Sequence, residues 1–496
     1  MDEKRPVYSV PAAREALLPE TPPVWQDLMA PLPALILSLV YWQVFAAERI
    51  FSGYGPGLGV PVFVGAYFAA VFLMLGKRPT ADGLLQAAAS LILALCCALY
   101  AHPGFTVLNC FVILLLAAMA TFSLSGQSRF SAFELRAVPE AVRLSVLALF
   151  TRIDRPFQLL KHLKKDGKGA VGRVLLTGAV TLALLAVVLA LLSSADMVFG
   201  SFFTGIAARL RALSWESALW RVIRTIVLAL LFASGLCFLR EPAPEVREKT
   251  APGPRRAIPF LVPAAALDIV YIIFCIIQVR YLFGGAAAAA MAGGWAAYAR
   301  TGFFQLVAVA CINLVLCLLG SDKQRFAAKG GLPLRLADGL MLLLTAVILA
   351  SALRRMQLYI GAYGLSVLRL MTLWGMLVIA AGLLAAGWKL LRPDFRFWRV
   401  FFGFALGTWC LFCLANPAGR VADYNVDAYL DGRLHEVDIT YLQELSADAA
   451  PALMRLRDGS DGYDDEIRRA LTALERDAEE SREHWSSRKL SCRNEG

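Results

Sequence analysis

The chain has 496 residues, of which 58% are hydrophobic and only 18% are charged, and its formal net charge is +11 at pH 7. A soluble domain is about 45–50% apolar and about 25% charged, so this composition excludes an ordinary soluble globular protein. The apolar residues lie in blocks of about 20, the helix length that crosses a bilayer, and no alternation typical of barrel strands is found. The sequence therefore predicts an all-α, polytopic transmembrane helical bundle.

In chain order, a polar segment precedes eleven apolar blocks and a charged C-terminal segment. Proline and glycine at His102-Pro103-Gly104 break the helix and separate the third and fourth blocks as a tight hairpin. The eleven expected spans are 31–50, 56–76, 84–101, 104–122, 171–193, 217–239, 258–283, 302–320, 336–356, 367–390 and 399–416.

The distribution of charge predicts the domain organisation and the orientation. Lysine and arginine gather between the fourth and fifth spans and in the loops after the sixth, eighth and tenth, which the positive-inside rule places in the cytoplasm. The N-terminus is then expected inside and the C-terminus outside. The expected parts are a cytoplasmic flexible arm (1–28), four N-terminal transmembrane helices (29–122), basic cytoplasmic interfacial helices at 139–153 and 156–165 (within 123–169), a core of about seven transmembrane helices (170–417) and a small soluble helical C-terminal appendix (418–496).

The deepest ionisable residue of the predicted spans is Asp268, about 15 Å into the seventh at about 1.5 Å per residue. A carboxylate near the middle of a bilayer is costly, so it marks either a functional site or a helix-joining hydrogen bond. Proton or cation coupling and a purely structural role both stay open for Asp268. For Gln278, Gln305 and Asn313, the other intramembrane polar candidates, we favour hydrogen bonds that join helices.

The sequence carries no catalytic signature. It has no phosphate-binding GxxxxGK[ST] loop, no GxSxG elbow and no zinc-binding histidine pair. Nine of the ten cysteines lie in or beside apolar blocks, where they act as small apolar residues. These observations favour a non-enzymatic protein with no catalytic residues, no metal site, no cofactor and no nucleic-acid partner.

Five strings of the sequence carry a family resemblance, most specifically Tyr298 to Phe304 and the pair Asn416-Pro417 followed by Tyr424-Asn425. The strings are 267–285, 296–314, 358–370, 416–430 and 437–456. They resemble the bacterial multi-pass membrane family called domain of unknown function 4173, which is related to the 4153 group. The resemblance covers roughly 170–496 and implies a bacterial cytoplasmic (cell) membrane protein. It implies no activity.

Several residues of these strings fall on the same predicted side of the membrane, just outside spans. We hypothesise that they form one polar cluster at the outer face, against which the C-terminal appendix docks. The cluster comprises Tyr298, Arg300, Tyr363, Arg369, Asn416, Tyr424 and Asn425.

The leading hypothesis is an integral membrane protein with a sensing, regulatory or envelope-associated role, contacting the lipid bilayer and a protein partner through its appendix. The first alternative is a secondary transporter or channel-like protein that uses Asp268. A weaker alternative is a membrane enzyme acting on a lipid-linked substrate.

Overall fold

The computed structural model describes residues 30–45, 56–75, 79–155, 215–240, 257–283, 303–321, 326, 331–459 and 463–482, with backbone only at 215–218, 278–283, 303 and 480–482. Within these ranges the chain is helical and contains no strand. The apolar helices are α1 (Pro31–Phe45), α3 (Gly59–Met74), α4 (Ala81–Leu99), α5 (Pro103–Ser125), α10 (Trp215–Phe238), α11 (Ile258–Phe283), α14 (Phe303–Gly320), α16 (Gly331–Tyr363), α17 (Val367–Leu391) and α18 (Phe397–Leu414).

The expected fold class, an all-α polytopic membrane bundle, is confirmed. Among the described residues, seven helices are long and apolar enough to cross a bilayer, and α1, α3 and α14 are shorter apolar helices. Ten of the eleven predicted spans coincide with one of these ten helices. The predicted span at 171–193 and the predicted interfacial helix at 156–165 lie outside the described residues.

The outward faces of these helices are apolar. Leu384 of α17 is 77% exposed while its neighbour Leu383 is 7% exposed, and Leu114 and Leu411 are also exposed. A soluble monomer rarely presents large apolar patches, because each exposed leucine orders water around it. Lipid hydrocarbon contains no water to be ordered, so these faces are suited to contact with lipid.

The chain forms two compact units, one from residues 1–38 and 148–238 and the other from 39–147 and 239–496. In the first unit, Ser234 of α10 donates a hydrogen bond to the Ala148 carbonyl (2.8 Å) and accepts one from the Arg152 amide (3.1 Å). One serine thereby joins α10 to the end of α6 (Ala137–Thr151).

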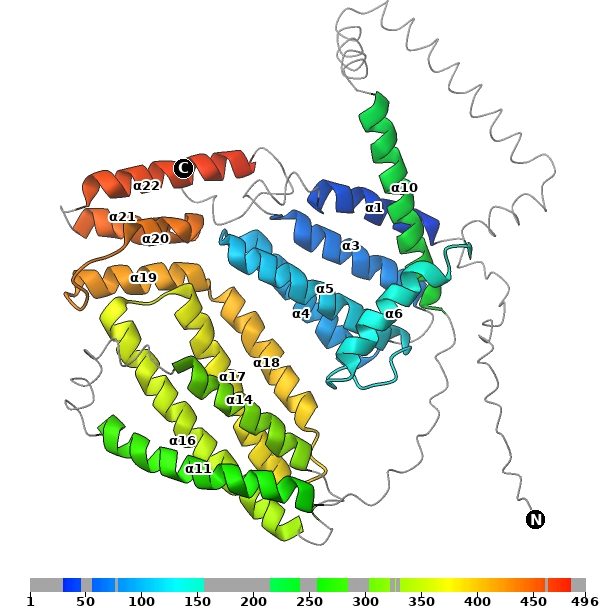
Figure 1. The fold of residues 1–496 in the computed structure, drawn as a ribbon. Helices are drawn as coiled ribbons and strands as arrows, with labels where there is room; N and C mark the ends of the chain where they lie inside the picture. The colour runs from blue at the N-terminus through cyan, green and yellow to red at the C-terminus, as the bar shows by residue number, and fades with distance from the viewer. Residues whose placement is uncertain are drawn as a thin grey trace, which may run out of the picture. The chain divides into compact units, whose positions relative to one another are not determined.

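The second unit contains two groups of helices that share α18. In one group, α11, α14 and α17 pack on α16, and Phe397 at the start of α18 joins their core. In the other, α3, α4 and α5 pack together, and Trp409, Cys410 and Cys413 near the end of α18 join that core. Helix α18 therefore connects the two groups within one unit (Figure 1).

Helix α16 has 33 residues and continues well past the predicted span at 336–356. At about 1.5 Å per residue it is roughly 50 Å long, more than the hydrocarbon thickness of about 30 Å. It ends where Gly364 adopts a left-handed conformation with φ of 75°. Arg354 and Arg355, at the end of the predicted span 336–356, therefore lie inside a helix.

The C-terminal segment folds into four helices, which we call the cap: α19 (Pro417–Leu430), α20 (Ile439–Glu444), α21 (Ala450–Gly459) and α22 (Asp464–Arg482), with a short 3₁₀ helix, Ser446–Ala449. Asn416 precedes α19 and accepts a hydrogen bond from the Gly419 amide, while Pro417 fits the first turn. Val421, Leu442, Leu453 and Ile467 form a core of their own. Figure 1 shows α19 lying across the ends of α17 and α18, which it contacts.

Candidate functional site

The cap is held on the α16–α17 hairpin by Asn425, a buried residue of α19. Its Oδ1 accepts a hydrogen bond from the Leu365 amide (2.7 Å), and its Nδ2 donates one to the Leu365 carbonyl (2.8 Å). One side chain thus satisfies both backbone groups of a residue at a helix break, where no helical partner is available. A Cβ at Gly364 would lie 2.6 Å from Asn425 Oδ1, so this approach requires glycine.

Two further side chains organise the same hairpin. The Tyr441 hydroxyl of α20 accepts a hydrogen bond from the Val367 amide (2.8 Å). Arg369 donates to the carbonyls of Tyr363 and Gly364, and its guanidinium lies 4.1 Å from the centre of the Tyr359 ring. Burial raises the pKa of the Tyr441 phenol, so this hydroxyl stays protonated at neutral pH.

A second attachment joins the cap to the α4–α5 hairpin. Asp448 Oδ2 accepts hydrogen bonds from the amides of Ala101 (2.8 Å) and His102 (3.0 Å). His102 in turn accepts a bond from the Phe105 amide at the start of α5. Because bonds from amides to a buried carboxylate are charge-assisted, these two hydrogen bonds are stronger than bonds between neutral groups.

The residues of the hypothesised outer cluster take several positions. Tyr363, through its carbonyl, and Arg369 lie at the hairpin to which Asn425 binds. Asn416 caps its own helix, and Arg433 lies over the Tyr424 ring at 5.7 Å. Tyr298 and Arg300 lie outside the described residues. The role of this cluster stays a prediction.

Inside the bundle, Asn313 of α14 joins three helices. Its Oδ1 accepts a hydrogen bond from the Tyr271 hydroxyl of α11 (2.8 Å), and its Nδ2 donates to Thr345 Oγ1 of α16 (2.9 Å). Asn313 is fully buried. These contacts suit the helix-joining role predicted for it, since buried amides between spans usually bond across helices.

Two buried carboxylates lie in the same group of helices. Asp268 of α11 is 4% exposed and Asp338 of α16 is 2% exposed, and the two interact electrostatically. Asp268 Oδ1 and Asp338 Oδ2 have no hydrogen-bond partner among the described residues. A proton or a cation bound at either carboxylate relieves the repulsion between the two.

Gly320 of α14 makes room for the second carboxylate, since a Cβ there would lie 3.0 Å from Asp338 Oδ2. Gln305 is exposed on the outside of α14, and the side chain of Gln278 lies outside the described residues. Within the described parts of the chain, no three His, Cys, Asp or Glu side chains gather as a metal site.

A family model described as "Domain of unknown function (DUF4153)" matches residues 87–456. The chain belongs to this DUF4153 family. No curated protein and no solved structure matches it. The DUF4153 match includes both cap attachments and both buried carboxylates and ends before α22. It agrees with the 4153 relationship drawn from the sequence and names no activity.

Sequence reasoning did not identify Asp338 and Asp448 as candidates. Asp338 stands near the start of a long apolar block, where an aspartate is usually hydrated, and its burial depends on Gly320 of another helix. Asp448 binds amides 346 and 347 residues away. The available signal was the turn at 101–104, where two amides beside a proline lack helical partners.

Proposed function

We propose that this DUF4153 protein is a non-enzymatic sensing or regulatory protein of the bacterial cytoplasmic membrane, in which the cap receives a signal and the helices transmit it. The observation that supports this proposal is the double attachment of the cap. Asn425 binds the α16–α17 hairpin and Asp448 binds the α4–α5 hairpin, each through backbone groups.

These attachments suit a transmitting role because they belong to different groups of helices. A displacement of the cap changes the hydrogen bonds of both hairpin ends together, which couples the two groups energetically. Helix α18 leads directly into α19 and has residues in both cores. The cap is therefore suited to biasing how the two groups pack.

The proposed side of the cap is the outer one. Positive loops retained in the cytoplasm place the opposite helix ends inside. The first turn of α22 is acidic, with Asp464, Asp465 and Glu466 all exposed. A protein partner with a basic surface fits this helix, and the resemblance of five strings to the 4173 group favours a bacterial membrane.

Hydrogen–deuterium exchange of the full protein in nanodiscs tests the coupling. Asp448→Ala removes the bonds at 101–102, and we expect faster exchange there and also at 364–367, which the substitution does not touch. Asp427→Ala is the control, because it removes only a surface ion pair with Arg455 (3.1 Å). Faster exchange confined to 101–102 would contradict the coupling.

A regulatory role itself is tested in cells by transcript profiling. We expect deletion of the gene to change a defined set of transcripts, parent protein to restore them, and a normally accumulated Asn425→Ala, Asp448→Ala double variant not to restore them. An unchanged profile after deletion would argue against regulation.

The buried carboxylates favour a second candidate function, proton- or cation-coupled transport. A buried carboxylate inside the membrane is energetically unfavourable, and here two of them, Asp268 and Asp338, interact. Asp268 and Asp338 would hold and release the coupling ion, while Tyr271, Asn313 and Thr345 fix the three helices around them.

Proton flux into proteoliposomes under an imposed pH gradient tests this candidate. We expect parent protein to exceed empty vesicles, and Asp268→Asn and Asp338→Asn each to remove the excess. Asp82→Asn is the matched control, because it makes the same change in a carboxylate that pairs with Arg399 at a helix end. Equal flux in parent and empty vesicles would exclude proton coupling.

A further inference from the structure

At the helix ends opposite the cap, the structure contains a cavity of about 680 Å³. It lies between the segment joining α5 to α6 and the segment joining α17 to α18. Its walls include Arg136, Lys389, Phe395, Arg396, Trp398 and Arg399. A volume of this size accommodates a small-molecule group such as a lipid headgroup.

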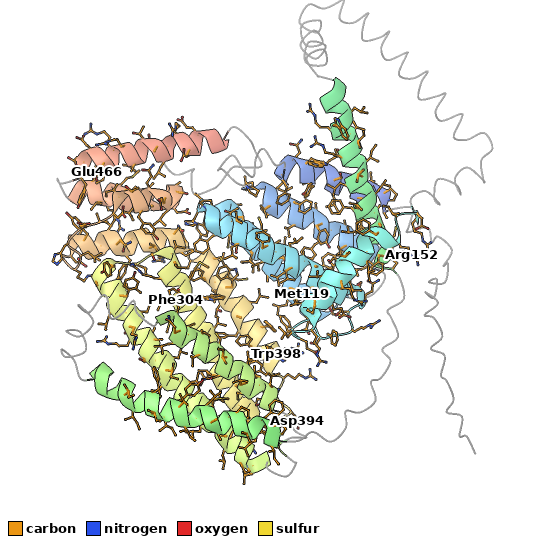
Figure 2. The ribbon with its side chains drawn as sticks, viewed as in Figure 1. Met119, Arg152, Phe304, Asp394, Trp398 and Glu466 are labelled. Atoms are coloured by element: carbon orange, nitrogen blue, oxygen red, sulfur yellow. The ribbon has the colours of Figure 1, made fainter. Side chains whose placement is uncertain are left out.

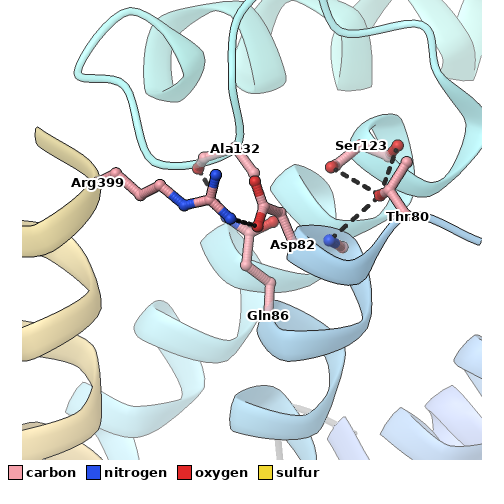
Figure 3. Close-up of polar contacts among 7 residues, drawn as sticks. Thr80, Asp82, Gln86, Ser123, Ala132 and Arg399 are labelled. Carbon is pink, nitrogen blue, oxygen red and sulfur yellow. Dashed lines mark hydrogen bonds and ion pairs between the residues drawn. The ribbon is translucent and has the colours of Figure 1, made fainter. Parts of the chain in front are cut away.

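The cavity has an excess of positive charge. Four cationic side chains line it, and Glu134 is the one carboxylate in the lining. Arg399 forms an ion pair with Asp82 of α4, with 2.7 Å between the two atoms. Figure 3 draws this pair. Counting both carboxylates against four cations leaves an excess of two positive charges.

Two of the cations have no ion-pair partner in the part of the chain that the structure describes. Lys389 and Arg396 form no ion pair with any carboxylate of the described residues. Like charges held together on a rigid frame repel each other, and an anion bound between them removes that repulsion. Phosphate suits the geometry because arginine offers it several donors at once.

The remaining wall is apolar and aromatic, which favours a phosphate-bearing ligand that also has an apolar part. Trp398, at the start of α18 (Figure 2), stacks on Phe402 with ring centres 5.5 Å apart. Leu135 of the same lining and Leu391, at the nearby end of α17, are both exposed. Tryptophan beside basic residues at the end of a span is typical of the membrane interface, where headgroups meet acyl chains.

The frame around the cavity is tied to α4. Gln86 of α4 donates a hydrogen bond to the Ala132 carbonyl (2.8 Å), and Thr80 donates one to the Ser123 carbonyl (3.2 Å), both drawn in Figure 3. The first bond fixes the 126–136 segment against α4, and the second fixes the end of α5 from which that segment starts, so this wall is preformed. A preformed site loses little entropy when a ligand binds.

We propose that this cavity binds the phosphate headgroup of an anionic phospholipid, whose acyl chains lie along the exposed apolar faces beside α17 and α18. Basic pockets between spans on the cytoplasmic side recognise such headgroups. The positive-inside orientation places this cavity on that side. The lipid then acts as a structural ligand of the helix ends opposite the cap.

Native mass spectrometry of the full protein tests the proposal after extraction from nanodiscs of phosphatidylcholine with phosphatidylglycerol. We expect the parent to retain phosphatidylglycerol, and Lys389→Gln, Arg396→Gln to retain it roughly 25-fold less strongly, because each basic side chain near a membrane contributes about a factor of five. The control is Arg129→Gln, Arg143→Gln, which removes the same charge from exposed positions outside the cavity lining.

Three outcomes decide the matter. Loss in the cavity double variant and retention in the control support the proposal, and equal retention in both overturns it. A third measurement adds glycerol 3-phosphate to the protein in phosphatidylcholine alone. If this compound stabilises the protein as much as phosphatidylglycerol does, the proposal is overturned, since the ligand would then be a soluble phosphate compound. If the double variant does not fold, the exposed Arg136→Gln replaces it, with an expected loss of about five-fold.

Discussion

At the scale of single residues, the cap attachments depend on side chains that replace missing backbone partners. Leu365 lies at a break between helices, so its amide and carbonyl lack the bonds that a helix supplies. Asn425 provides a donor and an acceptor together, which neither aspartate nor leucine of the same size does. The asparagine is therefore specific to this position.

Asn425→Ala should loosen the cap. It leaves two partly buried backbone groups unpaired, at about 1–3 kcal/mol each, so we expect the opening free energy of α19 to α21 to fall by about 2–6 kcal/mol. Amide exchange in these helices measures it. Asp427→Ala, on the same helix but on the surface, should change it by less than about 1 kcal/mol.

The stability of the folded protein should fall at alkaline pH. Tyr100 follows α4, and its hydroxyl donates a hydrogen bond to the Leu414 carbonyl at the end of α18. Burial raises the folded-state pKa values of Tyr441 and Tyr100 above those of the unfolded chain. Above about pH 10 the folded state holds protons that the unfolded state releases. The stabilisation from these two phenols is therefore fully present below about pH 10, and it is lost as the pH rises through their folded-state pKa values. Thermal unfolding between pH 8 and 11 measures this, and Tyr100→Phe, Tyr441→Phe should flatten the decline. A decline of unchanged steepness in that variant would contradict the assignment.

At the scale of elements, the limits of the helices follow from local chemistry. His102-Pro103-Gly104 predicts the α4–α5 turn from the sequence, because proline and glycine terminate helices wherever they occur together. The end of α16 at Gly364 was not predicted, since Gly361 and Gly364 look alike in the sequence. The difference is tertiary: Gly364 alone meets Asn425, a residue 61 positions later.

Gly364→Ala should therefore disrupt the hairpin while Gly361→Ala should not. Alanine at φ of 75° costs about 1–2 kcal/mol, and its Cβ would displace Asn425 Oδ1 from 2.6 Å. We expect exchange at 364–367 and in α19 to rise at least tenfold. Nothing lies within 4 Å of a Cβ at Gly361, where alanine should be neutral or slightly stabilising. Equal exchange in the two variants would contradict this account.

At the scale of the whole molecule, the sequence predicts the helices well and their packing poorly. An apolar block of about 20 residues can be recognised from the order of the residues alone, and ten predicted spans coincide with helices. Leu383 and Leu384 are the same residue type, yet one is buried and the other exposed. Core-facing and lipid-facing positions are equally apolar, and for this reason neither the Asp268–Asp338 pair nor the shared position of α18 could be read from composition.

The cap and the basic cavity lie at opposite ends of the same helices, and this arrangement predicts a labelling pattern in cells. In a Cys492→Ser background, Asp458→Cys places an exposed thiol on the cap, and Ser131→Cys places one at the cavity. The cytoplasmic excess of basic loops predicts that a membrane-impermeant maleimide labels the cap thiol in intact cells and the cavity thiol only after permeabilisation. The reverse pattern would invert the orientation and move the phospholipid site to the outer leaflet. Labelling of both thiols in intact cells would contradict a bundle that separates its two ends by a bilayer.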